Sequence, residues 1–286
     1  MSEVDQMNIF LYRNTLKKNS QDIAISIREF LHTNAANVYV EDEEAAIIEG
    51  KPLSAIDPQD IDVVITLGGD GTILRMVHSH PQINAPVLGV NLGSLGFMAD
   101  LPITEIHQGL NELLQRNFTV QERFMMEGSA SNGRTQFAVN DITFHRATNP
   151  ALVELEIFVD GDYLNTFSAD GIIFATPCGS TAYSLAAGGP IVTPELKAFI
   201  LTPISPHTIS NRPIVLMPKD EILVKYISQH KPVEVITDGL SSFPLATGET
   251  YHIRCAERKF RLVHLPNHNY FSTLRTKLAW TGTLKT

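Results

Sequence analysis

The sequence has two cysteines, Cys178 and Cys255, one tryptophan and no run of five or more basic residues. Two cysteines exclude a disulfide scaffold and are typical of a reducing compartment. The formal net charge of -9 lacks the basic cluster of a nucleic-acid-binding surface. No uncharged apolar run approaches the roughly 18 residues of a membrane span, and the acidic start MSEVDQMNIF does not resemble a secretory signal. We therefore expect a cytoplasmic protein without nucleic-acid or membrane partners.

Several common site motifs are also missing. The chain contains neither GxxxxGK[ST] nor GxGxxG, which removes the main support for a P-loop or a classical dinucleotide fold. HExxH is absent too, and Pro266 between His264 and His268 argues against one helix presenting both rings. We interpret these histidines, and His78 with His80, as surface or core residues, and predict no metal-ligating side chains.

The apolar content of 43% and the charged content of 19% are those of a globular chain. Residues 1–120 alternate between strand-like and helix-like segments, and the almost wholly apolar stretch Ile61 to Leu67 is typical of a parallel strand covered on both faces. Residues 121–265 are a succession of short alternating runs, such as QFAVNDITF, GIIFATP and FRLVHL, with a predicted hairpin turn at Asp160-Gly161. Residues 266–286 return to helix-like composition. The sequence therefore predicts an open α/β domain, a β-rich domain and a C-terminal segment.

A glycine-rich turn, GGDGT from Gly68 to Thr72, follows the buried strand and precedes a helical pattern expected from Thr72 to His78. Free backbone amides and the positive end of a helix attract phosphate, and glycine lets a bulky anion approach. Asp70 would repel that anion unless it serves a metal ion or the reaction, for example by orienting a hydroxyl and accepting its proton. The alternative is that Asp70 only caps the helix. The sequence alone leaves both open.

Two further segments are candidates for a binding site. The block DGIIFATPCGSTAYSLAAGGP, from Asp170 to Pro190, runs from a strand through a turn into small residues, where a flat ligand could approach and Tyr183 could stack on a ring. A packed connection with Tyr183 in the core would give the same pattern. The pair Asn140-Asp141 interrupts the apolar run FAVNDITF, so one of the two polar side chains could reach a ligand.

Taken together, GGDGT, NLGSLGF, Asn140-Asp141, the block from Asp170 to Pro190 and PHTISNRP resemble the NAD kinase family over nearly the whole chain. GGDG alone also occurs in lipid kinases, whereas TPCGSTAYSLAAGGP is far more particular to NAD kinases. The resemblance implies an α/β domain, a β-sandwich-like second domain, a C-terminal segment packed on the first domain, and a site in the cleft between the domains. It implies phosphorylation of the adenosine ribose 2′-hydroxyl of NAD, with ATP or another phosphoryl donor.

The same resemblance implies roles for individual residues. Asp70 would accept the proton of the 2′-hydroxyl, and Mg²⁺ would arrive on the donor phosphates. The implied binding residues are Gly68, Gly69, Gly71, Thr72, Phe97, Asn140, Asp141, Asp170, Thr181, Ala182, Tyr183 and Ala186, and His207 would border the site. A homodimer or homotetramer is implied, with a second subunit helping to complete the site. Many relatives have arginine where this chain has Ser168, which leaves open what makes the phosphate contact there; a different basic residue, for instance from another subunit, could substitute.

Two other functions remain as alternatives at this point. One is a lipid or diacylglycerol-type kinase that shares GGDG, and the TAYSLAAGGP block argues against it. The other is a regulator that binds NADP without turnover. An anionic residue at position 70 favours the enzyme, because a phosphate sensor would gain from a neutral residue there.

Overall fold

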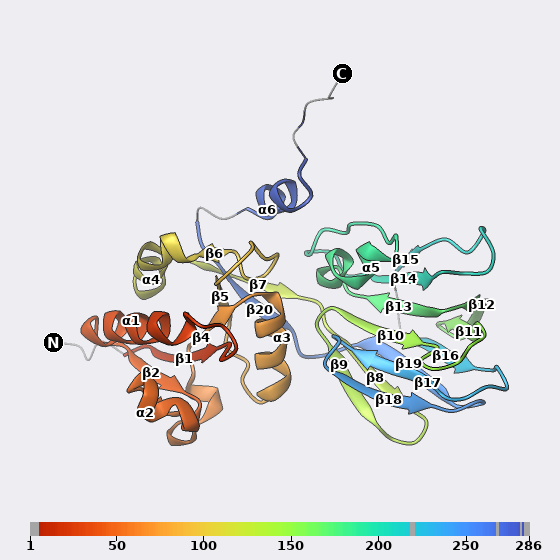
Figure 1. Ribbon diagram of the computed structural model, residues 1–286, viewed down its shortest axis with the longest axis horizontal. Coiled ribbons are helices and arrows are strands. Elements are labelled where there is room, and N and C mark those ends of the chain that lie inside the picture. The colour runs from red at the N-terminus through yellow and green to blue at the C-terminus, as the bar shows by residue number, and fades with distance from the viewer. Residues whose placement is uncertain (1–5, 218–220, 267–268, 281, 283–286) are drawn as a thin grey trace. The chain divides into compact units, whose positions relative to one another are not determined.

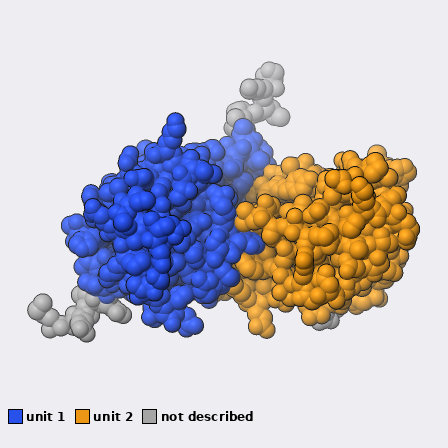
Figure 2. All heavy atoms as spheres, turned by 60° about the horizontal axis from the view of Figure 1, so that its bottom comes forward, with its two compact units in different colours: residues 1–121, 261–286 blue, residues 122–260 orange. Residues whose placement is uncertain are grey.

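The computed structural model describes residues 6–217, 221–266, 269–280 and 282. It contains two compact units, residues 1–121 with 261–286 and residues 122–260, which are coloured blue and orange in Figure 2. Each unit has its own cluster of buried apolar side chains. Residues 261–265, which the sequence placed with the second domain, belong to unit 1, because the strand Phe260–His264 pairs in parallel with Val87–Asn91.

Unit 1 is an eight-stranded sheet with flanking helices (Figure 1). The strand order is β3-β2-β1-β4-β5-β20-β7, and β6 pairs with β5. Its strands are β1 (Asn8–Arg13), β2 (Asn37–Val40), β3 (Lys51–Pro52), β4 (Val63–Gly68), β5 (Val87–Asn91), β6 (Leu101–Pro102), β7 (Thr119–Arg123) and β20 (Phe260–His264). Its α-helices are α1 (Ser20–Thr33), α2 (Ala45–Ile48), α3 (Asp70–Ser79), α4 (Ile106–Leu114) and α6 (Tyr270–Lys277), and its 3-10 turns are η1 (Asp42–Glu44), η2 (Leu53–Ala55), η3 (Pro58–Asp60) and η4 (Ile103–Glu105).

Helices cover both faces of this sheet. Side chains of α1 and α4, such as Ile27 and Leu110, share one buried cluster with Ile65 of β4. On the opposite face, a Cβ placed on Gly89 of β5 would lie 2.9 Å from the side chain of Ile73 on α3. Every residue of β4 and β5 is buried. The prediction of a strand covered on both faces, in a mostly parallel sheet, is therefore confirmed.

Unit 2 consists of two antiparallel sheets, ordered β15-β14-β13-β10-β17-β18 and β12-β11-β16-β19-β8-β9. The first contains β10 (Asp141–His145), β13 (Gly171–Ala175), β14 (Phe199–Ile204), β15 (Ile214–Leu216), β17 (Val233–Thr237) and β18 (Ser241–Leu245). The second contains β8 (Met126–Ala130), β9 (Thr135–Ala138), β11 (Val153–Val159), β12 (Asp162–Ala169), β16 (Ile222–Tyr226) and β19 (Thr250–Cys255). The turn η5 (Cys178–Thr181) and the short helix α5 (Tyr183–Ala186) follow β13.

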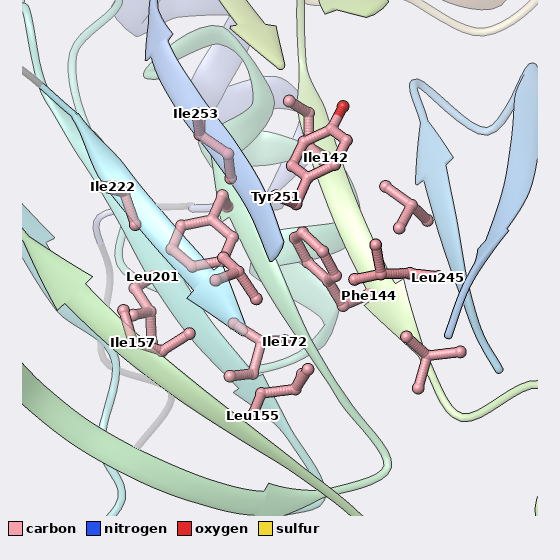
Figure 3. Close-up of a cluster of buried hydrophobic side chains, with 14 of the residues drawn as sticks. Ile142, Phe144, Leu155, Ile157, Ile172, Leu201, Ile222, Leu245, Tyr251 and Ile253 are labelled. Atoms are coloured by element: carbon pink, nitrogen blue, oxygen red, sulfur yellow. The ribbon is translucent and has the colours of Figure 1, made fainter. Parts of the chain in front are cut away.

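The two sheets enclose a core of alternating apolar side chains, as expected for a sandwich. Figure 3 shows Phe144 and Ile172 of one sheet packed with Ile157 and Tyr251 of the other. The rings of Phe144 and Tyr251 meet edge to face, with centroids 5.4 Å apart. The second domain is therefore a β-sandwich, as the family resemblance implied.

Two loop predictions have different outcomes. Asp160-Gly161 forms the expected hairpin turn between β11 and β12, with φ values of 50° and 88°. The single strand expected from QFAVNDITF is wrong, because β9 ends at Ala138 in one sheet and β10 begins at Asp141 in the other. Residues Val139 and Asn140 carry the chain from one sheet to the other.

No helix in the part of the chain that the structure describes is long and apolar enough to cross a membrane.

Candidate active site

The glycine turn of unit 1 lies at the carboxyl end of β4, which is where ligands bind in open α/β sheets. The helix α3 begins at Asp70, two residues earlier than the sequence suggested, and Thr72 N–H donates to Gly69 O at 2.8 Å. The N–H groups of Asp70 and Gly71, the first two of the helix, have no acceptor within it. A Cβ on Gly69 would meet nothing within 4 Å, and one on Gly71 would come no closer than 3.9 Å to another atom. The turn is therefore open to a bulky anion on the side of these two glycines.

The carboxylate of Asp70 accepts three backbone hydrogen bonds from one loop. Phe97 N–H donates to Oδ2 at 2.8 Å, and Met98 and Ala99 N–H donate to Oδ1 at 3.0 and 2.8 Å. A Cβ on Gly96 would lie 2.1 Å from Oδ1, so only glycine lets the carboxylate approach this closely. The helix-capping alternative is wrong: Gly69 is the N-cap, and the carboxylate binds amides outside the helix.

The loop from Leu92 to Ala99 is also held from the C-terminal helix. Lys277 Nζ of α6 donates to Leu95 O at 2.7 Å and lies 5.0 Å from the centre of the Phe97 ring. The ring of Tyr270 lies 6.2 Å from the same ring. The C-terminal helix therefore supports the loop that binds Asp70.

Arg75 places a positive charge beside the turn, one helical turn after Gly71. Its guanidinium donates to the Thr72 hydroxyl at 3.3 Å, and its side chain is exposed. A cation at this position offsets the repulsion between Asp70 and an incoming phosphate. The sequence analysis missed Arg75, although its position four residues after Gly71 on a helix was a usable signal.

In unit 2, Asn140 and Asp141 lie where the chain passes from one sheet to the other, and both are buried, with 8% and 6% of their surfaces exposed. The backbone amides of Val139, Asn140 and Asp141 donate to the carboxylate of Asp238 at 2.8, 2.7 and 3.0 Å. The side-chain oxygen of Asn140 has no hydrogen-bond partner among the described residues. A buried acceptor without a partner costs about 1–3 kcal/mol, so this amide is available to a ligand at the expense of stability.

Burial and the neighbouring charge of Asp238 raise the pKa of Asp141 to about 7. The side chain of Asp141 accepts a hydrogen bond from the Thr143 hydroxyl at 3.3 Å, which offsets little of the cost of burying its charge. Asp141 therefore keeps its proton up to about pH 7. Near neutral pH, Asp141 can donate an O–H as well as accept a hydrogen bond.

The predicted block after β13 is a turn with a very short helix. Gly179 packs against the chain crossing, since a Cβ there would lie 2.1 Å from Asn140 O. Thr181 donates its hydroxyl to Cys178 O at 3.1 Å, and Ala182 precedes α5. Tyr183 is 44% exposed, so the alternative that places it in the core is wrong, and Ala186 is exposed beside it. The structure thus brings the turn of this block to Asn140.

Asp170 lies at the other end of β13 from this group. Asp141 pairs with Ala175, five residues from Asp170, which corresponds to about 17 Å along the strand. Arg146 Nε lies 2.6 Å from Asp170 Oδ1, and the two residues form an ion pair. Within one chain Asp170 is not grouped with Asn140, contrary to the expectation that it would lie close by. Arg146 is the basic residue beside Asp170 that the sequence could not identify.

His80 and His207, two of the histidines in the described ranges, each have a partner within the chain. His80 is paired with Glu41, with Nε2 2.7 Å from Oε1, and its ring packs on Phe10. His268 lies outside the described residues. His207 is exposed, and its N–H donates to Ser168 O at 2.9 Å, next to Asp170. No group of three or more His, Cys, Asp or Glu side chains within the described ranges is arranged to hold a metal ion.

The chain thus combines an open α/β unit, whose glycine turn follows a buried parallel strand, with an antiparallel sandwich that holds a buried amide oxygen without a partner among the described residues. This combination defines a candidate nucleotide-binding protein of two units. The family model of the ATP-NAD kinase N-terminal domain matches residues 9–118, and that of the C-terminal domain matches residues 139–265. The chain belongs to the NAD kinase family.

Individual relatives agree with this assignment. The NAD kinase of Protochlamydia amoebophila is 56% identical over 97% of this chain and 99% of its own length, and that of Nitrosomonas europaea is 35% identical over 94% of each. Among solved structures, yeast NADH kinase in complex with NADH superposes with a TM-score of 0.85 at 29% identity, over 98% of this chain and 89% of its own. An Archaeoglobus fulgidus NAD kinase in complex with ATP gives 0.76 at 26% identity, over 96% and 99%.

Proposed function

We propose that the protein transfers the terminal phosphoryl group of ATP to the 2′-hydroxyl of the adenosine ribose of NAD, which yields NADP. Membership of the NAD kinase family supports the reaction. The observation that carries its chemistry is the carboxylate of Asp70, which is held at the start of a helix whose free amides face an open glycine turn. The neighbouring Gly68, Gly69, Gly71 and Thr72 contact the donor phosphates in this proposal.

Asp70 orients the ribose hydroxyl and accepts its proton late in the transfer. A carboxylate has about four acceptor positions, and three of those on Asp70 are used by the amides of Phe97, Met98 and Ala99. The remaining position is sufficient for one hydroxyl group. The transition state of phosphoryl transfer is loose and demands little from the base, so a carboxylate with this many partners meets the requirement.

A divalent cation enters with the donor. Mg²⁺ would be carried by the phosphate oxygens of the donor and by water, since it needs few protein ligands. When bound, it neutralises charge on the transferring group. The chain's own contribution is Arg75 beside the turn and the amides of α3.

Binding of the dinucleotide falls to Phe97 and to residues of unit 2. The unpaired Asn140 oxygen accepts an N–H of the ligand, and Asp141 exchanges hydrogen bonds with its hydroxyl groups. Tyr183 offers an exposed ring for stacking, and the residues beside it, Thr181, Ala182 and Ala186, leave space for a flat group.

We also propose that the enzyme is a homodimer or homotetramer. Asp170 and Arg146 lie at the far end of β13 from Asn140, so they act on a dinucleotide bound to another copy of the chain. Arg146 then supplies the positive charge that an arginine at position 168 would provide and that Ser168 lacks. Cys178 and Cys255 form no disulfide, which supports a cytoplasmic location.

The function is tested by incubating the purified protein with ATP, Mg²⁺ and NAD, and by measuring NADP with a coupled NADP-dependent dehydrogenase. Asp70→Asn is expected to lower kcat by about 100-fold or more while it still binds NAD. Asp62→Asn is the matched control, because Asp62 precedes β4 at its other end and accepts one backbone N–H, from Asn8 at 2.8 Å. This control keeps wild-type rates.

The outcomes separate the parts of the proposal. If no donor yields NADP while diacylglycerol is phosphorylated, the protein is a lipid kinase. Tight NADP binding without turnover would identify a regulator. Equal rates in the Asp70→Asn variant and the wild type would remove only the proton-acceptor role.

The oligomer is tested by complementation. Asp70→Asn and Asp170→Asn chains, each weakly active alone, are co-expressed and purified together. Recovery of a substantial part of the activity means that a site uses Asp170 from another copy. No recovery, with mixed oligomers verified by mass spectrometry, contradicts this arrangement.

A further inference from the structure

The chain crosses from β9 to β10 at Val139, Asn140 and Asp141, which we call the crossing. Two distant residues form hydrogen bonds with its whole backbone. The three amides of Val139, Asn140 and Asp141 donate to the Asp238 carboxylate, and Asp238 N–H donates to Asp141 O at 3.0 Å. The Thr176 hydroxyl donates to Val139 O at 2.6 Å, and Thr176 N–H donates to Asn140 O at 2.8 Å. All six backbone polar groups of the crossing therefore have partners from Asp238 and Thr176.

Both of these partners are placed by turns. Asp238 and Gly239 form the hairpin turn between β17 and β18, with φ values of 50° and 66°, so the carboxylate projects at the tip of a rigid hairpin. Thr176 directly follows β13, is fully buried and also accepts the N–H of Gly179 at 3.1 Å. Neither residue can shift without moving its turn.

This arrangement leaves the side chains of the crossing for another purpose. The backbone is saturated, yet the buried Asn140 oxygen has no partner among the described residues. A crossing that served packing alone would not leave a buried amide oxygen unpaired. Asp238 and Thr176, which we call the two anchors, thus hold the side chain of Asn140 in a fixed position, where its oxygen is available to a ligand.

We propose that Asp238 and Thr176 are positioning residues for the dinucleotide, which fix Asn140 and Asp141 in the orientation that binds NAD. This inference rests on the proposed function, since it assumes that Asn140 and Asp141 contact the substrate. Neither anchor needs to touch NAD itself. Their effect is on affinity for NAD rather than on the phosphoryl transfer step.

Asp238 has a second effect, through charge. It is the charged group that acts on Asp141, while the neighbouring strands place uncharged Ala175 opposite Asp141 and Thr237 opposite Ile142. The negative charge of Asp238 contributes to the raised pKa of Asp141, after burial, which is the larger cause. Removing it lowers that pKa and moves the pH at which Asp141 stops donating a hydrogen bond.

The test compares four variants by KM for NAD, kcat, the pH profile of KM and NADP affinity by calorimetry. Asp238→Asn is expected to raise KM at least about tenfold, to change kcat less than about threefold, and to move the pH profile of KM to lower pH. Thr176→Val, which lacks the hydroxyl, raises KM similarly, and Thr176→Ser, which keeps it, restores KM to within about threefold of wild type. Asp160→Asn is the matched control, because Asp160-Gly161 is the other hairpin turn with φ values near 50° and 88° and lies elsewhere in unit 2. It leaves all four quantities unchanged.

The outcomes also separate this inference from the proposed function. A wild-type protein that makes no NADP contradicts the function, and calorimetry with NADP then tests the anchors alone. A wild type that makes NADP, with an unchanged KM and pH profile in folded Asp238→Asn, overturns the inference. Equal effects in Asp160→Asn would do the same. If Asp238→Asn fails to fold, the comparison of Thr176→Ser with Thr176→Val tests the inference. The same KM for NAD in these two variants contradicts the positioning role.

Discussion

Replacing Asp141 by asparagine should stabilise the protein, and by an amount that increases with pH. Asp141 is buried with one hydroxyl donor and the charge of Asp238 nearby, so its ionised form is disfavoured in the folded chain. Asparagine keeps an oxygen acceptor for Thr143 and cannot ionise. The variant therefore avoids the cost of a buried charge and keeps the shape of the site.

The magnitude follows from the pKa of Asp141, which is about 7 in the folded protein against about 3.9 in an unfolded chain. Between these values the folded chain keeps a proton that the unfolded chain releases, so the free energy of unfolding falls as pH rises and levels off above pH 7. A difference of about 3 in pKa corresponds to about 4 kcal/mol in total. Between pH 5 and pH 8 the gap between variant and wild type should widen by about 2.7 kcal/mol.

The assay is urea unfolding of both proteins at several pH values from 5 to 8. Titration of all other groups is common to both proteins and cancels in the difference. Asp160→Asn is measured in parallel as a surface reference, because this aspartate lies in an exposed turn, where its Oδ1 accepts the Glu221 N–H at 3.2 Å. A gap between Asp141→Asn and wild type that stays constant with pH would refute the claim that the folded protein raises the pKa of Asp141 to about 7.

Three further changes have defined expectations. Gly179→Ala forces a Cβ to within 2.1 Å of Asn140 O and should lower the free energy of unfolding, measured with urea, by about 3 kcal/mol. The same variant should bind NAD more weakly. Arg146→Gln breaks the half-exposed pair with Asp170, so the unfolding free energy changes by less than about 1 kcal/mol while KM for NAD rises in steady-state assays. Lys277→Met removes a donor to the loop carbonyl that it contacts, and should raise hydrogen exchange of the loop amides and lower kcat at unchanged overall stability.

The sequence predicted the elements well, but it did not show which elements lie together. The buried run at β4 and the Asp160-Gly161 turn are local patterns, and both are present in the structure. The run QFAVNDITF also looked like one strand, because the residues on both sides of Asn140-Asp141 suit a strand. The break at Val139 is fixed by Asp238 and Thr176, which are 99 and 37 residues away. Local periodicity contains no information about such partners.

The same limit applied to the candidate site. The glycines of the turn were recognisable because glycine has few other reasons to occur in such a run. Arg75, Lys277 and Asp238 were missed because a charged side chain on a helix or in a turn is usually a solvated one. Their relevance depends on what they contact, and those contacts join segments far apart in the chain.

The four Asp-Gly pairs of the chain, at residues 70, 160, 170 and 238, show what separates a turn from a site. The dipeptide is identical in each, yet Asp70 and Asp238 each accept three consecutive amides, whereas Asp170 pairs with Arg146 and Asp160 accepts the N–H of Glu221. Three consecutive amides converge on one point only where the chain bends around it, so each such carboxylate fixes the shape of a second segment. In this chain both of those segments contain residues proposed to bind NAD, Phe97 in one and Asn140 with Asp141 in the other. The number of amides that converge on an aspartate therefore separates these two pairs from the plain hairpin turn at residue 160, which the dipeptide itself could not do.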